Sequence, residues 1–170
     1  LPIMSDSVSA FPVLGAKKSA DLFKKYGVLN KAEVESRLHI TVEKYVKQMT
    51  IEAETMVQMA RQMILPAALE HQRRTAEALD ATEQAGARDA RLKKELQAYV
   101  AMVGDFSESV ETLEKAAAAH DDDPMKHARH IKAKVVPAMA EARRIADALE
   151  QVISAELWPL PTYRELLFLK

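Results

Sequence analysis

The chain has 170 residues, a formal net charge of −1, 48% hydrophobic residues and 29% charged residues. This length and composition predict one globular domain with a real core, and the near-zero charge gives no reason to expect nucleic acid or a membrane as partner. The sequence contains no cysteine, which excludes a disulfide framework, a thiolate zinc site and a cysteine nucleophile, and favours the cytoplasm.

The start of the chain and its hydropathy bear on what kind of polypeptide this is. No apolar run approaches the roughly 20 residues that cross a bilayer. The opening residues, LPIMSDSVSAFPVLG, lack the basic start and continuous apolar core of a signal peptide, and they do not begin with methionine. We therefore expect a fragment or a processed product of a longer protein.

The first element is short. Residues 1–16 contain Pro2, Pro12 and Gly15 and are predicted to form an irregular lead-in. A helix is expected from about Lys18 to Tyr26, closed by Gly27 in a left-handed conformation.

The first long helix begins with a capping box, in which Asn30 is the N-cap and Glu33 lies three residues later. Apolar residues then recur every three or four positions, which marks one face of a helix reaching to about Gly86. Pro66 lies inside this pattern and predicts a kink, not a stop, because the periodicity resumes at once. The residues of this predicted face are Val34, Leu38, Val42, Tyr45, Met49, Ala53, Met56, Ala60, Met63 and Ala67.

Two further long helices have heptad spacing. The second has its apolar face at Leu92, Leu96, Tyr99, Val103, Phe106, Val110, Leu113 and Ala117. The third starts with Asp123 as N-cap and Pro124 at the first helical position, and carries an interior proline, Pro137. Its apolar face is Ile131, Val135, Ala138, Ala142, Ile145, Leu149 and Val152.

These elements predict an all-α fold of three long antiparallel helices, two of them kinked by interior prolines, with a short N-terminal helix and an irregular tail. Residues 1–170 are expected to form a single helical domain, divided into the lead-in at 1–16, the bundle at 17–156 and the apolar tail at 157–170.

The strongest candidate for a metal site is the segment around the third helix start, with His120, Asp121, Asp122, Asp123, His127 and His130. Imidazole and carboxylate groups can bind metals. A polar turn whose aspartates cap a helix explains the same residues and is favoured. A di-iron bundle is set aside because no histidine has a glutamate three residues earlier. We assign no catalytic, cofactor-binding or metal-binding residue.

Other polar and apolar patterns have ordinary explanations. The methionine stripe at Met49, Met56, Met59 and Met63 is typical of core filling at helical spacing. Five arginines could bind phosphate, but charge pairs on solvated helix faces explain them equally well. These are Arg61, Arg73, Arg74, Arg143 and Arg144.

The tail, ELWPLPTYRELLFLK, is aromatic and apolar and is broken by two prolines. Such a segment would leave an exposed apolar patch in water, so it is predicted to dock against protein. The residues expected to anchor it are Trp158, Leu160, Tyr163, Leu167 and Phe168.

Three stretches carry a resemblance to a known family. They are LFKKYGVLNKAEVESRLHITVEKYVKQM, the following TIEAETMVQMARQMILPAALEHQ, and the tail. Together they resemble the C-terminal region of type III glutamine synthetases, from about Phe11 to Lys170. The segment between Gly86 and Asp123 is generic amphipathic helix.

The resemblance implies a part of a large enzyme that ligates ammonia to glutamate, driven by ATP and Mg or Mn. The catalytic core of that family would precede Leu1, so no catalytic residue is carried over to this chain. The resemblance further implies a role in subunit packing within a homo-oligomer, with the catalytic domain and neighbouring subunits as partners. The alternative is a free-standing helical adaptor that binds a partner helix.

Overall fold

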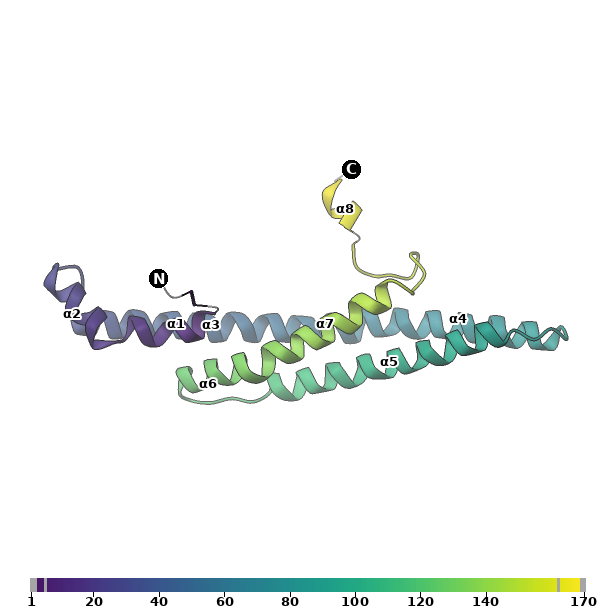
Figure 1. Ribbon diagram of the computed structural model, residues 1–170, viewed down its shortest axis with the longest axis horizontal. Coiled ribbons are helices and arrows are strands. Elements are labelled where there is room, and N and C mark those ends of the chain that lie inside the picture. Colours follow the sequence, from purple (N-terminus) through teal and green to yellow (C-terminus); the bar gives the residue numbers. More distant parts are fainter. Residues whose placement is uncertain (1–2, 5, 162, 169–170) are drawn as a thin grey trace. The chain divides into compact units, whose positions relative to one another are not determined.

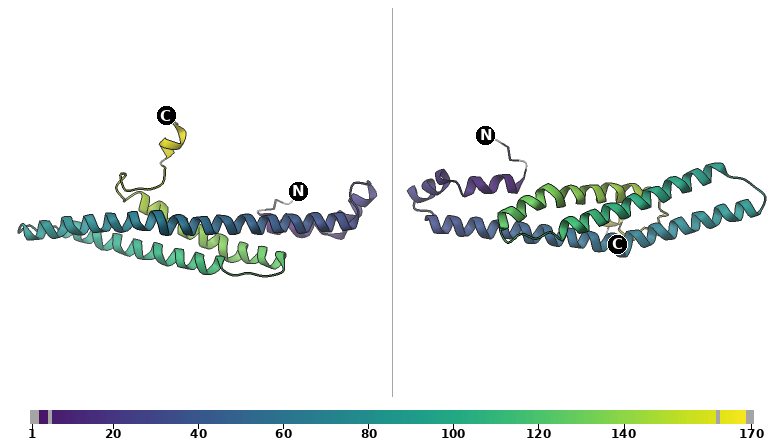
Figure 2. Two further views of the ribbon diagram at one scale, coloured as in Figure 1. Left: turned by 180° about the vertical axis from the view of Figure 1, so that it is seen from behind. Right: turned by 90° about the horizontal axis from the view of Figure 1, so that it is seen from below.

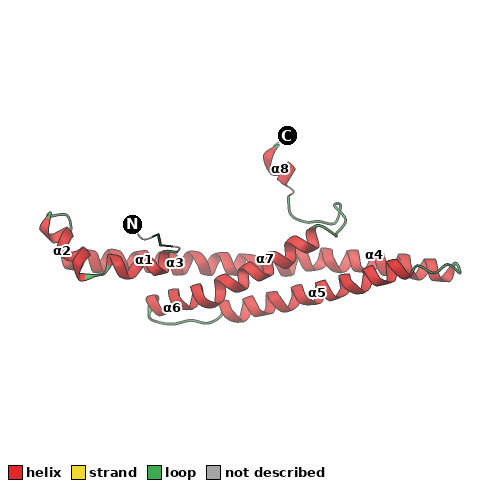
Figure 3. Cartoon of the chain, viewed as in Figure 1, coloured by secondary structure: helices red, strands yellow, loops and turns green. Residues whose placement is uncertain are grey.

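The computed structural model describes residues 3–4, 6–161 and 163–168, and each regular element within these residues is a helix (Figure 3). The predicted all-α class is confirmed. The elements are α1 (Ser7–Leu14), α2 (Lys17–Lys25), α3 (Lys31–Met59), the π-helical η1 (Ala60–Ile64), α4 (Leu65–Gln84), α5 (Ala90–Ala117), α6 (Pro124–His130), the π-helical η2 (Ile131–Val135), α7 (Val136–Glu150) and α8 (Tyr163–Leu167).

Figure 1 labels the helices along the chain, and the contacts among them divide the chain into two compact units. Unit 1 comprises Leu1–Ala53 and Ala116–Pro137, and unit 2 comprises Glu54–Lys115 and Ala138–Lys170. The three long helical stretches, at 31–84, 90–117 and 124–150, match the three long helices expected from the apolar periodicity. That residues 1–170 act as one domain stays a prediction.

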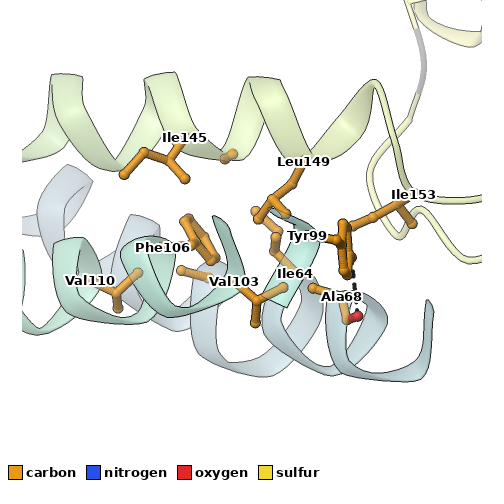
Figure 4. Close-up of a cluster of buried hydrophobic side chains, with 11 residues drawn as sticks. Ile64, Ala68, Tyr99, Val103, Phe106, Val110, Ile145, Leu149 and Ile153 are labelled. Atoms are coloured by element: carbon orange, nitrogen blue, oxygen red, sulfur yellow. Dashed lines mark hydrogen bonds between the residues drawn. The ribbon is translucent and has the colours of Figure 1, made fainter. Parts of the chain in front are cut away.

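The core of unit 2 lies where η1 and α4, α5 and α7 meet. The chain reverses direction between α4 and α5, and α7 runs back along α5 (Figure 2). The Tyr99 hydroxyl donates a hydrogen bond to the Ala68 carbonyl at 3.1 Å, which ties α5 to α4 (Figure 4). Burying each large apolar side chain here stabilises the fold by about 1.5–3 kcal/mol. The buried cluster consists of Ala60, Ile64, Ala68, Tyr99, Val103, Phe106, Val110, Ile145, Ala146, Leu149 and Ile153.

The core of unit 1 is built around α1. Val8 and Phe11 are buried against Val42 of α3 and Ala128 of α6. The ring of Phe11 meets that of Tyr45 edge to face, with centroids 5.8 Å apart. Thus α1 packs on α3 and α6 and supplies part of the core of this unit.

The prediction that residues 1–16 are an irregular lead-in is wrong for residues 7–14, which form α1. Asp6 caps this helix by accepting a hydrogen bond from the Ser9 amide at 2.8 Å. Pro12 lies inside the helix and removes one backbone donor, but burial of Val8 and Phe11 outweighs that loss. Lys132 of η2 ties the start of α1 down, with its Nζ 2.9 Å from Asp6.

The two interior prolines stand in the same local setting. Pro66 follows η1 and Pro137 follows η2, each separated from the π segment by a single residue. A proline ring clashes with the carbonyl four residues back in regular α-helix, and π winding just before it relieves that crowding. The helices continue past both prolines, as predicted.

The π segment changes which face of the first long helix is buried. The predicted face continues through Ala60 to Met63 and Ala67, whereas the structure buries Ala60, Ile64 and Ala68 and leaves Met63 exposed. A π turn holds one more residue than an α turn, so the buried face moves on by one position. That part of the predicted face is therefore wrong.

Three predicted helix-end signals are confirmed, whereas Val152, predicted on the apolar face of the third helix, lies beyond the end of α7 at Glu150 and is exposed. The Asn30 side chain accepts from the Glu33 amide at 3.0 Å while the Glu33 carboxylate accepts from the Asn30 amide at 2.7 Å, which is the reciprocal capping box. Gly27 has φ of 62° and closes α2 in the left-handed region. Asp123 caps α6 by accepting from the Met125 amide at 2.8 Å.

Among the described residues, no helix combines the length and the apolar character needed to cross a membrane.

Candidate docking segment

Residues 154–156, which follow α7 and which we call the tail root, are held on α4. The Ser154 amide donates to Nδ1 of His71 at 3.4 Å, and the ring of His71 meets Tyr99 edge to face at 5.0 Å between centroids. Glu156 forms an ion pair with Arg74. Two polar links therefore fix the chain as it leaves α7, and the ring contact with Tyr99 positions His71 for one of them.

The next residues pack on the core of unit 2. Leu157, Trp158 and Leu160 are partly buried and contact its buried cluster. The indole Nε1 of Trp158 is covered, with no hydrogen-bond partner among the described residues. Leaving such a donor unpaired costs about 1–3 kcal/mol, so the apolar contacts of the ring must outweigh that cost.

Beyond Pro161 the tail leaves this core. It forms the single short helix α8, so the prediction of an irregular tail is wrong at this point. The side chains of Leu166, Leu167 and Phe168 are 62%, 61% and 70% exposed, respectively. We call these three adjacent, exposed apolar side chains the apolar end.

The five predicted docking residues thus fall into three groups. Trp158 and Leu160 pack on the core of their own unit, whereas Leu167 and Phe168 face solvent. Tyr163 begins α8, and its side chain lies outside the described residues. Docking of this segment against other protein stays a prediction.

The arginines considered as phosphate ligands are occupied by carboxylates. Arg73 and Arg74 both bind Glu70, with N–O distances of 2.7 and 2.8 Å. Their hydrogen bonds lower the pKa of Glu70 to about 2, so this carboxylate is charged at neutral pH. Arg61 pairs with Glu114, Arg143 with Asp147 and Arg144 with Glu141. The structure therefore favours the charge-pair interpretation of all five.

The histidine and aspartate residues near the start of α6 have structural roles. Asp123 caps the helix, and Nε2 of His130 lies 2.9 Å from the Ala116 carbonyl. His127 is buried, and its ring stands 5.2 Å from that of His120. Within the described part of the chain, no three histidine, aspartate or glutamate side chains come together as a metal site would require.

Sequence reasoning missed the residues that hold the tail root. His71 and Ser154 are 83 positions apart, and Arg74 and Glu156 are 82 apart. No local pattern signals such pairs, because helix-surface charges are common and their long-range partners depend on packing. The methionine stripe is also split, with Met49, Met56 and Met59 half-buried and Met63 exposed.

The chain is similar to known proteins over most of its length. Residues 1–83 match the family model described as "Glutamine synthetase C-terminal domain". Residues 1–83 belong to this family. The match spans α1, α2, α3, η1 and all but the last residue of α4. The family expected from the resemblance of residues 22–72 and of the tail is confirmed.

Three curated relatives are similar to this chain over most of its length. The type-3 glutamine synthetase of Dictyostelium discoideum is 28% identical over 92% of this chain and 22% of its own length. The glutamine synthetase of Bacteroides fragilis is 31% identical over 84% of this chain and 21% of its own length. That of Butyrivibrio fibrisolvens is 26% identical over 99% of this chain and 25% of its own length. The chain therefore spans a quarter or less of the relatives it matches.

Proposed function

We propose that this chain is the helical C-terminal domain of a glutamine synthetase subunit, and that it serves the packing of subunits in a homo-oligomer and carries no catalytic residue. The parent enzyme would ligate ammonia to glutamate with ATP and Mg or Mn. The described residues of this chain do not fit such a metal, since they offer no cluster of three potential ligands. No step of the ligation is assigned to them.

The observation that carries the assembly role is the apolar end. Its three side chains are exposed, yet the tail root just before them is fixed by His71, Arg74 and the packed Trp158. A segment that is anchored at one end and apolar at the other presents a surface for a second body of protein. Burying each of these side chains would contribute about 1.5–3 kcal/mol.

The partners that fit are the catalytic part of the same polypeptide and neighbouring subunits. The relatives are about four to five times as long as the matched region, since it spans 21–25% of their lengths. That leaves ample protein for the apolar end to meet. Membership of the family favours this role over that of a free-standing adaptor.

The test uses the full-length protein that contains this domain, with Leu167→Ser and Phe168→Ser combined. We expect the assembled form to dissociate at protein concentrations at least tenfold higher than for the unchanged protein, because the substitutions remove apolar area from the contact. The mass is followed by light scattering across a dilution series, alongside glutamine formation.

The matched control combines Ile40→Ser and Ile51→Ser, two exposed side chains of α3. It should assemble normally, since the number of exposed apolar side chains removed is the same but the site is different. A tail variant that assembles as well as this control would contradict the assembly role.

A further inference from the structure

Helix α2 presents a second exposed surface, in addition to the apolar end. No residue of α2 is buried, and it carries four lysines against a single aspartate, Asp21. Lys18, Leu22 and Lys25 recur at i, i+4 and i+7, so they share one face of the helix. Leu22 is 53% exposed and the neighbouring Tyr26 is 69% exposed. We call Lys18, Leu22 and Lys25 the basic face.

Local bonds hold α2 in place without core packing. The Ser19 hydroxyl donates to the Val13 carbonyl at 2.7 Å, across the corner from α1. At the other end, the Gly27 amide donates to the Lys24 carbonyl and the Val28 amide to the Phe23 carbonyl, which is a Schellman motif. A nine-residue helix is marginal alone in water, so these bonds at its two ends help to hold α2 although none of its residues is buried.

A groove of complementary charge lies between α5 and α7 in unit 2. Its volume is about 300 Å³. Asp105, Glu108 and Thr112 line one wall at i, i+3 and i+7, and Glu141 lies on the other wall. Neither Asp105 nor Glu108 has an ion-pair partner within 4 Å among the described residues. The charge of Arg144 nevertheless interacts with that of Asp105. Arg144 also lines the groove and pairs with Glu141, so the groove holds three carboxylates against one arginine. We call it the acidic groove.

We propose that the basic face of α2 in one copy of this chain binds the acidic groove of a second copy. The inference rests on the proposed role in subunit packing and specifies one contact that performs it. Seven helical residues rise about 10.5 Å, which separates Lys18 from Lys25 along α2, whereas Asp105 and Glu108 are about 4.5 Å apart along α5. Lysine side chains are long and flexible, so both can converge on this carboxylate pair while Leu22 lies between them, near Ile145 at the groove.

The contact is heterologous, because each copy offers the basic face to one neighbour and the acidic groove to another. Opposite charges in partly apolar surroundings steer association and set its register. Salt must weaken the contact, since exposed charges are screened beyond about 8–10 Å at 0.10–0.15 M salt.

The test follows the mass of the 170-residue chain by light scattering, from micromolar to millimolar protein, at low and high salt. We expect the mass to rise above the 19.0 kDa of one chain at low salt. Lys18→Glu combined with Lys25→Glu should weaken association at least tenfold, and so should Asp105→Lys combined with Glu108→Lys. Circular dichroism confirms that each variant is folded.

Mixing the two double variants distinguishes this contact from other effects of charge. Each mixed pair keeps one native basic face and one native acidic groove, and its two reversed surfaces also carry opposite charges, so mixing should restore association. The control variant, Lys44→Glu with Lys47→Glu, reverses two exposed lysines of α3 and should associate like the unchanged chain.

Several results would overturn the inference. They are a chain of 19.0 kDa at every concentration, variants that associate like the control, and mixtures that fail to restore association. Binding of the unchanged chain to anionic vesicles without self-association would also overturn it and would assign α2 to a lipid surface.

The proposed function can fail separately. If the tail variant loses assembly while the α2 variant keeps it, only the present contact is wrong. If the α2 variant loses self-association and the tail variant assembles normally, the α2 contact stands and the role of the apolar end is wrong.

Discussion

His127 is the buried histidine of unit 1, on the first turns of α6. Burial lowers its pKa from the ordinary value of 6.5, because a charged imidazole loses hydration there. The nearby charges of His120 and His130 lower the pKa further, whereas Asp121 raises it. The neutral ring is therefore the form that the fold accommodates.

This shift predicts how stability depends on pH. Below pH 6.5 and above the lowered pKa of the folded state, the unfolded chain binds more protons at this residue, so the free energy of unfolding falls as the pH falls through that window. Urea unfolding at pH 7.5 and 5.5 should show this loss in the unchanged chain, and His127→Gln should lessen it.

His39→Gln is the matched control, since the His39 side chain is 59% exposed and lies beside Glu43. It should keep the pH dependence that His127→Gln lessens. If the two variants behave alike between pH 7.5 and 5.5, burial of His127 does not contribute to that dependence.

At the scale of the element, α6 owes its start to Asp123. The Asp123 carboxylate accepts from the amides of Met125 and Lys126, and Pro124 at the first helical position needs no donor of its own. The neighbouring Asp122 carries the same charge, but its side chain is fully exposed. Asp123 therefore caps the helix, whereas the preceding Asp122 does not.

The pair allows a matched test of the cap. Asp123→Ala should lower the free energy of unfolding by about 1 kcal/mol, since it removes the acceptor for two end amides of α6. Asp122→Ala should leave it unchanged within about 0.5 kcal/mol. Denaturant unfolding at pH 7 measures both, and equal losses would show that charge in the loop matters more than the cap.

At the scale of the whole molecule, the two units have separate buried clusters. Phe11 belongs to that of unit 1, and Phe106 belongs to that of unit 2. The helical stretch 31–84 contributes residues to both clusters, through Val42 in unit 1 and through Ala60 and Ile64 in unit 2. The arrangement raises the question of whether the units lose structure independently.

We expect Phe11→Ala to destabilise unit 1 by about 3–5 kcal/mol, because it empties a buried site that α1 fills. Amide hydrogen exchange should rise in α1, α6 and the first turns of α3, and stay unchanged in α5 and α7. Val13→Ala, at an exposed position of the same helix, is the control and should change neither unit. Equal acceleration in both units would show that they unfold together.

Much of this fold could be predicted because its signals are local. The capping box of Asn30 and Glu33, the Asp123 cap and the Gly27 closure each depend on residues within a few positions of one another. The heptad spacing of α5 likewise identified Tyr99, Val103, Phe106, Val110 and Leu113, all of which are buried. Local hydrogen bonds and helical periodicity require no knowledge of the partner helix.

The all-α class, the three long helices and their starting caps, and the family that residues 1–83 match could all be predicted from sequence patterns. Three features depend on how the helices pack: residues 7–14 form a packed helix, the π segment moves burial from Met63 to Ile64, and Arg74 and Glu156 hold the tail root. The two groups of features differ in the sequence separation of the residues that determine them. Caps and periodicity act over three or four residues, whereas register, burial and ion pairs across the fold are set by which helix faces meet.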